Sequence, residues 1–342
     1  MTHYNLALIG FGNVGRSFAR LLLRKEIELK EQYGVTFNIT AIATGRHGAA
    51  LDREGLDIDQ ALKLVETGQP LNALSKQPTP ENMLEFIRLC GADVLFENTP
   101  VNYQTGQPAV DHLRTALECG MHAITANKGP VVHAYRLLTE LAQTHGSKFL
   151  FEGTVMDGAP IFSLFRGTLP AARLLAFRGV LNSTTNLILT RMENGESFDE
   201  AVRYAQKIGV AETDPSGDID GWDASVKVAA LATVLMDIPI KPTEVDRQGI
   251  RQITADQIAR AKADGKRWKL VCSARRTEQG LRAKVAPELV GMDSPLFSVE
   301  GTTSIIQFET DVLGLLSVVE SDPGPDTTAY GLLADFINAV RS

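Results

Sequence analysis

Apolar and amphipathic stretches alternate along the first part of the chain, and this order predicts an open α/β sheet. Residues 5–10 read as a buried strand, and residues 17–24 have the spacing of an amphipathic helix. Further strands are expected over 38–43, 92–97 and 122–126. The later part differs: a β-leaning stretch with period-two patches spans 268–320, and an amphipathic helix is expected over 327–340.

Composition narrows the class of protein. The chain has 342 residues, of which 44% are hydrophobic and 22% charged, and this suits a folded protein of two domains. The net charge is −7 with scattered basic residues, which argues against a nucleic-acid partner. We find no leader-like N-terminus and no apolar run of membrane-spanning length, so we expect a cytoplasmic protein without a membrane partner. Three widely spaced cysteines, Cys90, Cys119 and Cys272, are expected to be reduced packing residues.

A glycine motif follows the first strand directly and precedes the first helix. In G-x-G-x-x-G the first glycine allows a tight turn, the second admits a pyrophosphate, and the third allows close helix packing. Glycine turns also serve structure alone, but the position between strand and helix favours dinucleotide binding. The motif consists of Gly10, Phe11, Gly12, Asn13, Val14 and Gly15.

The end of the second strand bears on the choice of dinucleotide. An NAD site usually has an acid there for the ribose 2′-hydroxyl, whereas this chain reads Thr44-Gly45-Arg46-His47-Gly48. Arg46, with His47, is suited to a 2′-phosphate. We therefore expect a preference for NADP(H), with NAD(H) still open. The alternative is that Arg46 lies in a solvent loop without a ligand.

Two polar clusters follow later strands. Asn98, Thr99 and Pro100 come after one strand, and Asn127-Lys128-Gly129 after the next. Open α/β sheets bind ligands at the carboxyl ends of their strands, so both clusters are candidate ligand contacts. A third segment, Glu152 to Pro160, is glycine-rich, and its exposed carbonyls together with Glu152 suit a hard cation. A plain glycine-proline turn remains the alternative there.

An acidic segment is the most informative part of the second half. Five carboxylates crowd a turn-rich stretch, and a lysine follows on a predicted helix: Glu212, Asp214, Asp218, Asp220, Asp223 and Lys227. Asp223 and Lys227 stand four apart, so one helix face carries both. A capped surface helix with an ordinary ion pair is one interpretation. The other is a pocket whose carboxylates bind a substrate ammonium while the lysine handles a proton.

Together these motifs resemble the homoserine dehydrogenase family, and the resemblance covers nearly the whole chain. Its carriers are the glycine motif, Asn98–Pro100, Thr125–Pro130, Asn182-Ser183-Thr184-Thr185-Asn186 and the segment from Glu212 to Lys227. The resemblance implies NAD(P)H-dependent reduction of L-aspartate 4-semialdehyde to L-homoserine. Ser183 stands where the family usually has glycine, and Val210 where tyrosine is common. The family's glycine-rich loop near the C-terminus reads Ser321-Asp-Pro-Gly324-Pro-Asp.

The resemblance also implies roles for single residues. Lys227 and Lys128 correspond to catalytic-site lysines, and Asp223 to their carboxylate partner. Glu212, Asp218, Thr184 and Ser183 correspond to substrate-binding positions, and Gly324 and Lys128 also to cofactor contacts. A monovalent cation, Na⁺ or K⁺, is expected at Glu152, Val155, Asp157 and Ala159.

The expected architecture follows from the same resemblance. We expect an α/β fold: a Rossmann-type dinucleotide-binding domain over 1–149 and an α+β substrate and dimerisation domain over 150–320. A terminal helix over 326–342 should pack back on the first domain, and a homodimer is expected. The chain stops without the ligand-sensing domain of longer members, so a short form is expected. Two alternatives remain: a related NADP-dependent reductase of another small amino or oxo acid, and a non-catalytic NADP-binding sensor.

Overall fold

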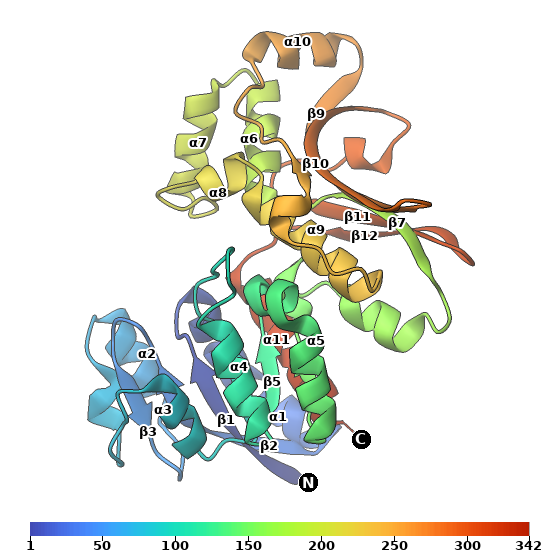
Figure 1. Cartoon of the computed structure of the whole chain (residues 1–342). Coiled ribbons are helices and arrows are strands. Elements are labelled where there is room, and N and C mark those ends of the chain that lie inside the picture. The colour runs from blue at the N-terminus through green and yellow to red at the C-terminus, as the bar shows by residue number, and fades with distance from the viewer. Residues whose placement is uncertain (342) are drawn as a thin grey trace. The chain divides into compact units, whose positions relative to one another are not determined.

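The computed structural model describes residues 1–341, which divide into two compact units (Figure 1). The first unit contains residues 1–160 together with the C-terminal helix α11 (Pro325–Val340), and the second contains Ile161–Gly324. The second unit is therefore an insertion in the chain of the first. No helix among residues 1–341 is long and apolar enough to cross a membrane.

The first unit is built on a six-stranded sheet with the order β3-β2-β1-β4-β5-β6. Its pairs are parallel except for β3, which runs antiparallel to β2. The order reverses between β1 and β4, and open α/β sheets bind their ligands at the carboxyl ends of the strands at such a point. The strands are β1 (Thr2–Ile9), β2 (Val35–Ala43), β3 (Ala49–Leu51), β4 (Val94–Glu97), β5 (His122–Thr125) and β6 (Phe149–Leu150).

Helix α11 completes the core of the first unit. Its Phe336 lies edge-on to both Tyr4 and Phe96, with ring centroids 6.0 Å apart in each pair. Lys148 adds a bond from its Nζ to the carbonyl of Asn338 at 2.8 Å. The other helices of the unit are α1 (Asn13–Tyr33), α2 (Ile58–Glu66), α3 (Met83–Leu89), α4 (Ala109–Glu118) and α5 (Lys128–Thr144).

The second unit has a six-stranded sheet of mostly antiparallel strands, in the order β12-β11-β7-β9-β10-β8. The β8–β10 pair alone is parallel. Its strands are β7 (Leu174–Val180), β8 (Asp246–Arg247), β9 (Lys266–Thr277), β10 (Gly280–Gly291), β11 (Ser304–Thr310) and β12 (Gly314–Glu320). Its helices are α6 (Ser183–Glu193), α7 (Phe198–Lys207), α8 (Ser216–Ile219), α9 (Trp222–Leu235) and α10 (Ala255–Ala263).

The two faces of this second sheet differ. Phe177, Ala274 and Phe308 are cross-strand neighbours, and all three are buried. The alternate positions Arg178, Ser273 and Gln307 line an open hollow of about 480 Å³. One face is thus core, whereas the other is polar around this hollow and is buried farther along the strands, at Val180, Val271 and Ile305.

Some sequence predictions need correction. Helix α1 begins at Asn13, inside the glycine motif, rather than at residue 17, because the backbone turn at Gly10–Gly12 already leads into the helix. Cys90 and Cys272 are buried, but Cys119 is exposed, so only two of the three cysteines are packing residues. Cys119 is the residue directly after α4, where the helix ends at the surface.

Candidate active site

The glycine motif connects β1 to α1, and its three glycines meet different surroundings. Gly10 has φ +92°, and a Cβ there would lie 2.4 Å from the carbonyl carbon of Asn98. A Cβ at Gly15 would lie 2.4 Å from the Gly10 oxygen. A Cβ at Gly12 would meet nothing within 4 Å, so packing inside the protein does not require glycine there. Gly12 is also the N-cap of α1 and forms no side-chain cap bond, which leaves the helix N-terminus accessible to an anion.

The segment after β2 carries the basic residues of the expected 2′-phosphate site. His47 donates its backbone N–H to Thr44 Oγ1 at 2.6 Å, and Thr44 N bonds Gly48 O at 2.9 Å, so the turn is closed on itself. Arg46 is exposed at the tip of this turn. Residues 44–48 thus place an arginine, and no carboxylate, just after the end of β2.

Asn98 marks the carboxyl end of β4. Both polar atoms of its side chain are buried, yet neither has a hydrogen-bond partner among residues 1–341. An amide left in this state costs about 1–3 kcal/mol, which a bound polar ligand would recover. Thr99 and Pro100 continue the cluster, and Asn127 ties it to the next one through a bond from its Nδ2 to Thr99 O at 3.0 Å. Lys128 is the first residue of α5 and is half-buried.

Glu97 is a residue of this edge that we did not single out from the sequence. Its fully buried carboxylate accepts bonds from Thr99 N at 3.2 Å and from Thr125 Oγ1 at 3.4 Å, and it lies 3.5 Å from His112 Nδ1. It therefore fixes both strand-end clusters. The available signal was a charged residue ending an apolar strand.

In the second unit, the start of α6 gathers the candidate chemistry. Asn182 caps the helix by accepting a bond from Thr185 N at 2.8 Å. Its Nδ2 donates to Asp218 Oδ1 at 2.6 Å and to Asp223 Oδ2 at 3.1 Å. Lys227 Nζ donates to the carbonyl of Leu181 at 2.6 Å and lies 3.4 Å from Asp223 Oδ2. The structure thus brings Asp218, Asp223 and Lys227 together around one helix N-terminus.

Electrostatics at this cluster favour a cationic ligand. Burial raises the pKa of Asp218, and the nearby charge of Asp223 raises it further. Bonds from Asn182 and Thr184 and the charge of Lys227 act in the opposite direction. Two carboxylates share one lysine here, so an added ammonium group would lower the repulsion between them.

The structure separates the remaining acids of the segment. Asp220 pairs with Arg251 at 3.0 Å, and Asp214 accepts a bond from Ser216 N at 3.1 Å, so neither belongs to the α6 cluster. The five carboxylates that crowd this segment in the sequence are thus not gathered in one place, because the short helix α8 turns them in different directions. Of the other predicted substrate residues, Glu212 is exposed and Thr184 is buried. Thr184 Oγ1 donates to Val210 O at 3.3 Å, and Ser183 Oγ lies 3.5 Å from Ser304 Oγ.

The expected cation loop lies in the first unit, against α11. We expected exposed carbonyls, but residues 152–156 are buried, because Glu152 N bonds Asp335 Oδ2 at 2.6 Å and Thr327 Oγ1 bonds Asp157 Oδ2 at 2.9 Å. Asp157 has φ +41°, a left-handed backbone conformation that residues other than glycine rarely adopt. Ala159 closes the loop by a bond to Met156 O at 2.8 Å. Gly324 directly precedes α11, where a Cβ would meet nothing within 4 Å.

Comparison with known proteins decides the family. A family model described as "Homoserine dehydrogenase" matches residues 160–337, and one described as "Homoserine dehydrogenase, NAD binding domain" matches residues 10–152. The chain belongs to the homoserine dehydrogenase family. This membership confirms the predicted α/β fold with a Rossmann-type domain, and the predicted NAD(P)-dependent oxidoreductase class.

Individual members cover almost the whole chain. An "NAD(+)-dependent homoserine dehydrogenase" from Pseudomonas canavaninivorans is 37% identical, over 100% of this chain and 97% of its own. A homoserine dehydrogenase from Methanocaldococcus jannaschii is 36% identical over 99% of each chain. The solved structure of a hyperthermophilic archaeal homoserine dehydrogenase mutant in complex with NADPH matches with a TM-score of 0.83 and 29% identity, over 99% of this chain and 98% of its own.

Proposed function

We propose that the protein catalyses the NAD(P)H-dependent reduction of L-aspartate 4-semialdehyde to L-homoserine, in the cytoplasm. Family membership supports the reaction, and the observation that carries it in this chain is the cluster of Asp218, Asp223 and Lys227 at the N-terminus of α6. The substrate has an ammonium, a carboxylate and an aldehyde. The cluster offers acids, a helix N-terminus and a proton-bearing lysine.

Each group of the substrate has a counterpart in this chain. Asp218 and Glu212 bind the α-ammonium, and the first backbone N–H groups of α6, with Ser183 and Thr184, bind the carboxylate. Lys227 stabilises the developing alkoxide and gives its proton to that oxygen, while Asp223 at 3.4 Å holds the lysine in place. Lys128, the first residue of α5, is the second catalytic lysine. When bound, the dinucleotide supplies the hydride that reduces the aldehyde carbon.

The residues of the first unit fit a dinucleotide. Gly12 leaves open space at a helix N-terminus, as a pyrophosphate requires, and the buried amide of Asn98 lacks a partner among residues 1–341. Gly10, Phe11, Asn13, Val14 and Gly15 shape the turn, and Thr99, Pro100 and Lys128 are further contacts in this proposal. Gly324, the last residue of the second unit, is also a contact in this proposal.

For the dinucleotide we propose a preference for NADP(H), with Arg46 and His47 beside Thr44 as the 2′-phosphate site. Relatives point both ways, since one is named NAD(+)-dependent and another is bound to NADPH. Arg46→Ala tests the proposal through kcat/KM for NADP⁺ and NAD⁺. We expect a loss of about tenfold or more for NADP⁺ alone, the usual size for a charged hydrogen bond. Equal losses for both, or a wild-type preference for NAD⁺, would reject this site.

A monovalent cation, Na⁺ or K⁺, is proposed at Glu152, Val155, Asp157 and Ala159. The donors are hard oxygens, and Glu152 is a buried carboxylate, which suits such an ion. Titrating KCl and NaCl against choline chloride at fixed ionic strength should raise the melting temperature with one of the two alkali ions. The same melting temperature in all three salts would remove the cation from the proposal.

We further propose a homodimer formed through the open face of the second sheet. This face has exposed apolar residues at one edge, Leu315 at 69% and Val319 at 56%. Its hollow holds both signs of charge, with Arg178 paired to Glu288 at 2.9 Å and Arg275 paired to Glu309. A two-fold interface needs such a self-complementary surface. The double variant Leu315→Lys/Val319→Lys should be a monomer by light scattering, and Leu137→Lys, at an exposed position of α5, should behave as the wild type.

The deciding experiment is homoserine-dependent reduction of NADP⁺ and NAD⁺ by purified protein, compared with other short hydroxy amino acids. Turnover with homoserine above the others supports the proposal. Higher turnover with a different substrate favours the related-reductase alternative. Dinucleotide binding without any turnover favours the sensor.

A further inference from the structure

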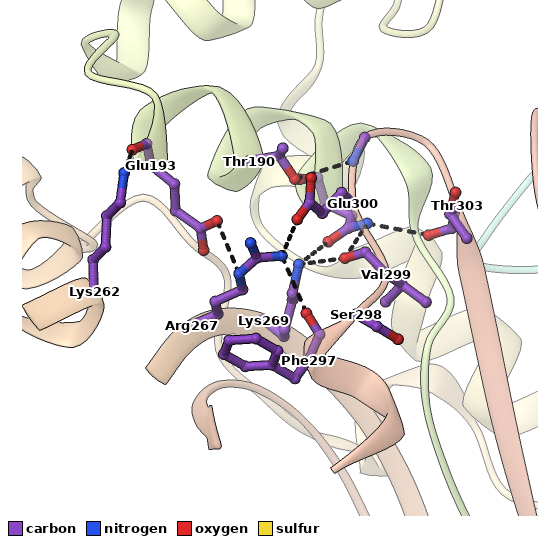
Figure 2. A network of polar contacts seen from close by, with 12 residues as sticks. Thr190, Glu193, Lys262, Arg267, Lys269, Phe297, Ser298, Val299, Glu300 and Thr303 are labelled. Carbon is purple, nitrogen blue, oxygen red and sulfur yellow. Dashed lines mark hydrogen bonds and ion pairs between the residues drawn. The ribbon is translucent and has the colours of Figure 1, made fainter. Parts of the chain in front are cut away.

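A buried lysine bonds α6, the helix whose first turn belongs to the candidate substrate site. Lys269 on β9 is 0% exposed, and its Nζ donates to Asn186 Oδ1 at 2.9 Å and to Val299 O at 2.6 Å (Figure 2). Both acceptors are neutral. A buried ammonium is costly, and an apolar residue of similar volume often stabilises a fold more. Stability alone therefore gives little reason for a lysine at this position.

The lysine belongs to a network that fastens one segment to α6. Asn186, Thr190 and Glu193 are spaced four and three residues apart, so they share one face of the helix. Asn186 Nδ2 donates to Thr303 O at 3.1 Å, and Thr190 Oγ1 accepts from Gly301 N at 3.1 Å. Glu193 contacts Arg267, which itself binds the segment 297–303, so all three helix residues are linked to that segment (Figure 2).

Arg267 supplies the third contact. Its Nε lies 3.5 Å from Glu193 Oε2, and its Nη1 pairs with Glu300 and donates to Phe297 O at 3.2 Å. The segment 297–303 is thus bound to α6 over two helical turns. Lys269 lies at the end of this network that is nearest the start of the helix.

That end leads directly to the candidate substrate residues. Asn186 lies one turn after the cap Asn182, which holds Asp218 and Asp223. The segment 297–303 runs into Ser304, whose Oγ is 3.5 Å from Ser183 Oγ. A change at Lys269 therefore reaches the first turn of α6 both through Asn186 and through the segment.

We propose that Lys269 is a positioning residue for the substrate: it holds Asn186 and the segment 297–303 so that the first turn of α6 keeps its place beside Asp218 and Lys227. This inference rests on the proposed function. Lys269 does not touch the substrate; it acts through its bonds to Asn186 and to Val299 of the segment.

Lys269→Met removes the ammonium and keeps an apolar chain of similar length. We expect KM for homoserine to rise about tenfold, the scale of a lost charged hydrogen bond. The Kd for NADPH, measured by fluorescence without turnover, should stay within about twofold, because its site lies in the other unit. Lys262→Met is the control, since this exposed lysine bonds Glu193 O at 3.1 Å on the outer side of the same network; its KM should equal that of the wild type.

A double variant tests whether Lys269 acts through Asn186. Lys269→Met/Asn186→Leu should raise KM by less than the product of the two single effects, whereas fully independent effects would overturn the proposal. An unchanged KM with a lower melting temperature would also overturn it, because that result shows a structural role only. If the methionine variant does not fold, Lys269→Gln, which retains an uncharged donor, is judged by the same KM and Kd values. A wild type without homoserine turnover would reject the proposed function and this inference together, whereas wild-type turnover with an unaltered variant KM rejects this inference alone.

Discussion

Lys227 bonds the backbone just before α6, and Lys269 bonds a side chain within α6. The surroundings of the two lysines differ in kind. The side chain of Lys227 is 14% exposed and lies 3.4 Å from a carboxylate, in a cluster that also contains Asp218. Lys269 is 0% exposed, and its two bonded acceptors are neutral oxygens. A cation that keeps some exposure beside carboxylates can meet a ligand and exchange a proton. A fully buried lysine among neutral acceptors cannot meet a ligand, so its role is to hold its neighbours in place.

The largest effect is expected on kcat, when the lysine beside the carboxylates is removed. Lys227→Ala should lower kcat by roughly 10²- to 10⁴-fold, because it removes the group that protonates the alkoxide. Steady-state kinetics with homoserine and NADP⁺ measure this, with NADPH affinity as the control. Loss of NADPH binding with a normal kcat would show that Lys227 has a different role.

The next effect concerns pH. Burial lowers the pKa of Lys269 from 10.5 to about 8, partly offset by the charge of Glu193. Between these two values the unfolded chain keeps a proton that the folded chain has released, so folding stability rises with pH across this window, by up to roughly 3 kcal/mol. Urea unfolding of the wild type and of Lys269→Met at pH 7.5 and 10 measures the difference.

Comparison with the methionine variant removes the contribution of other titrating groups. The stability of the wild type relative to the variant should increase from pH 7.5 to 10. A constant difference would mean that Lys269 keeps its proton in the folded state throughout, contrary to this description of the buried site.

A smaller effect tests the carboxylates beside Lys227. Asp218→Asn keeps the shape of the side chain and removes its charge, so KM for homoserine should rise about tenfold, the scale of a lost charge-assisted bond. Asp214→Asn is the matched control in the same segment, because that carboxylate is exposed and lies outside the cluster. Equal KM values for the two variants would remove Asp218 from the substrate site.

The smallest effect is expected at Glu212. Its side chain is exposed, and water screens an exposed charge, so Glu212→Gln should raise KM for homoserine only about threefold. The ratio of the Asp218 and Glu212 effects therefore measures how burial strengthens the hold on an ammonium. A larger effect at Glu212 than at Asp218 would reverse this ranking.

The sequence predicted best what depends on short separations. The four-residue spacing of Asp223 and Lys227 predicted one helix face, and the structure pairs the two side chains. The alternation of strands and helices predicted the open α/β sheet, and the structure places Gly10–Gly15 at the turn from its first strand into its first helix. Helical and strand periods are properties of local backbone geometry, which neighbouring residues determine.

Contacts across long separations were not predictable in the same way. Lys269 and Asn186 are 83 residues apart, and no local pattern marks either as the partner of the other. Asp214 and Asp220 carry the same charge as Asp218, but the turn at α8 directs them elsewhere. Cys119 was predicted to be a packing residue like the other two cysteines, yet it lies directly after α4 and is exposed. Tertiary packing determines each of these side-chain contacts and exposures.

The insertion of one unit into the other has a consequence for synthesis. Phe336, Leu332 and Ala329 of α11 are buried in the core that β1 and α1 begin. A ribosome delivers these residues only after the entire second unit has been made, so the second unit can fold while the first still lacks part of its interior. The first unit, although its strands are encoded first, therefore cannot complete its core until the end of the chain has emerged.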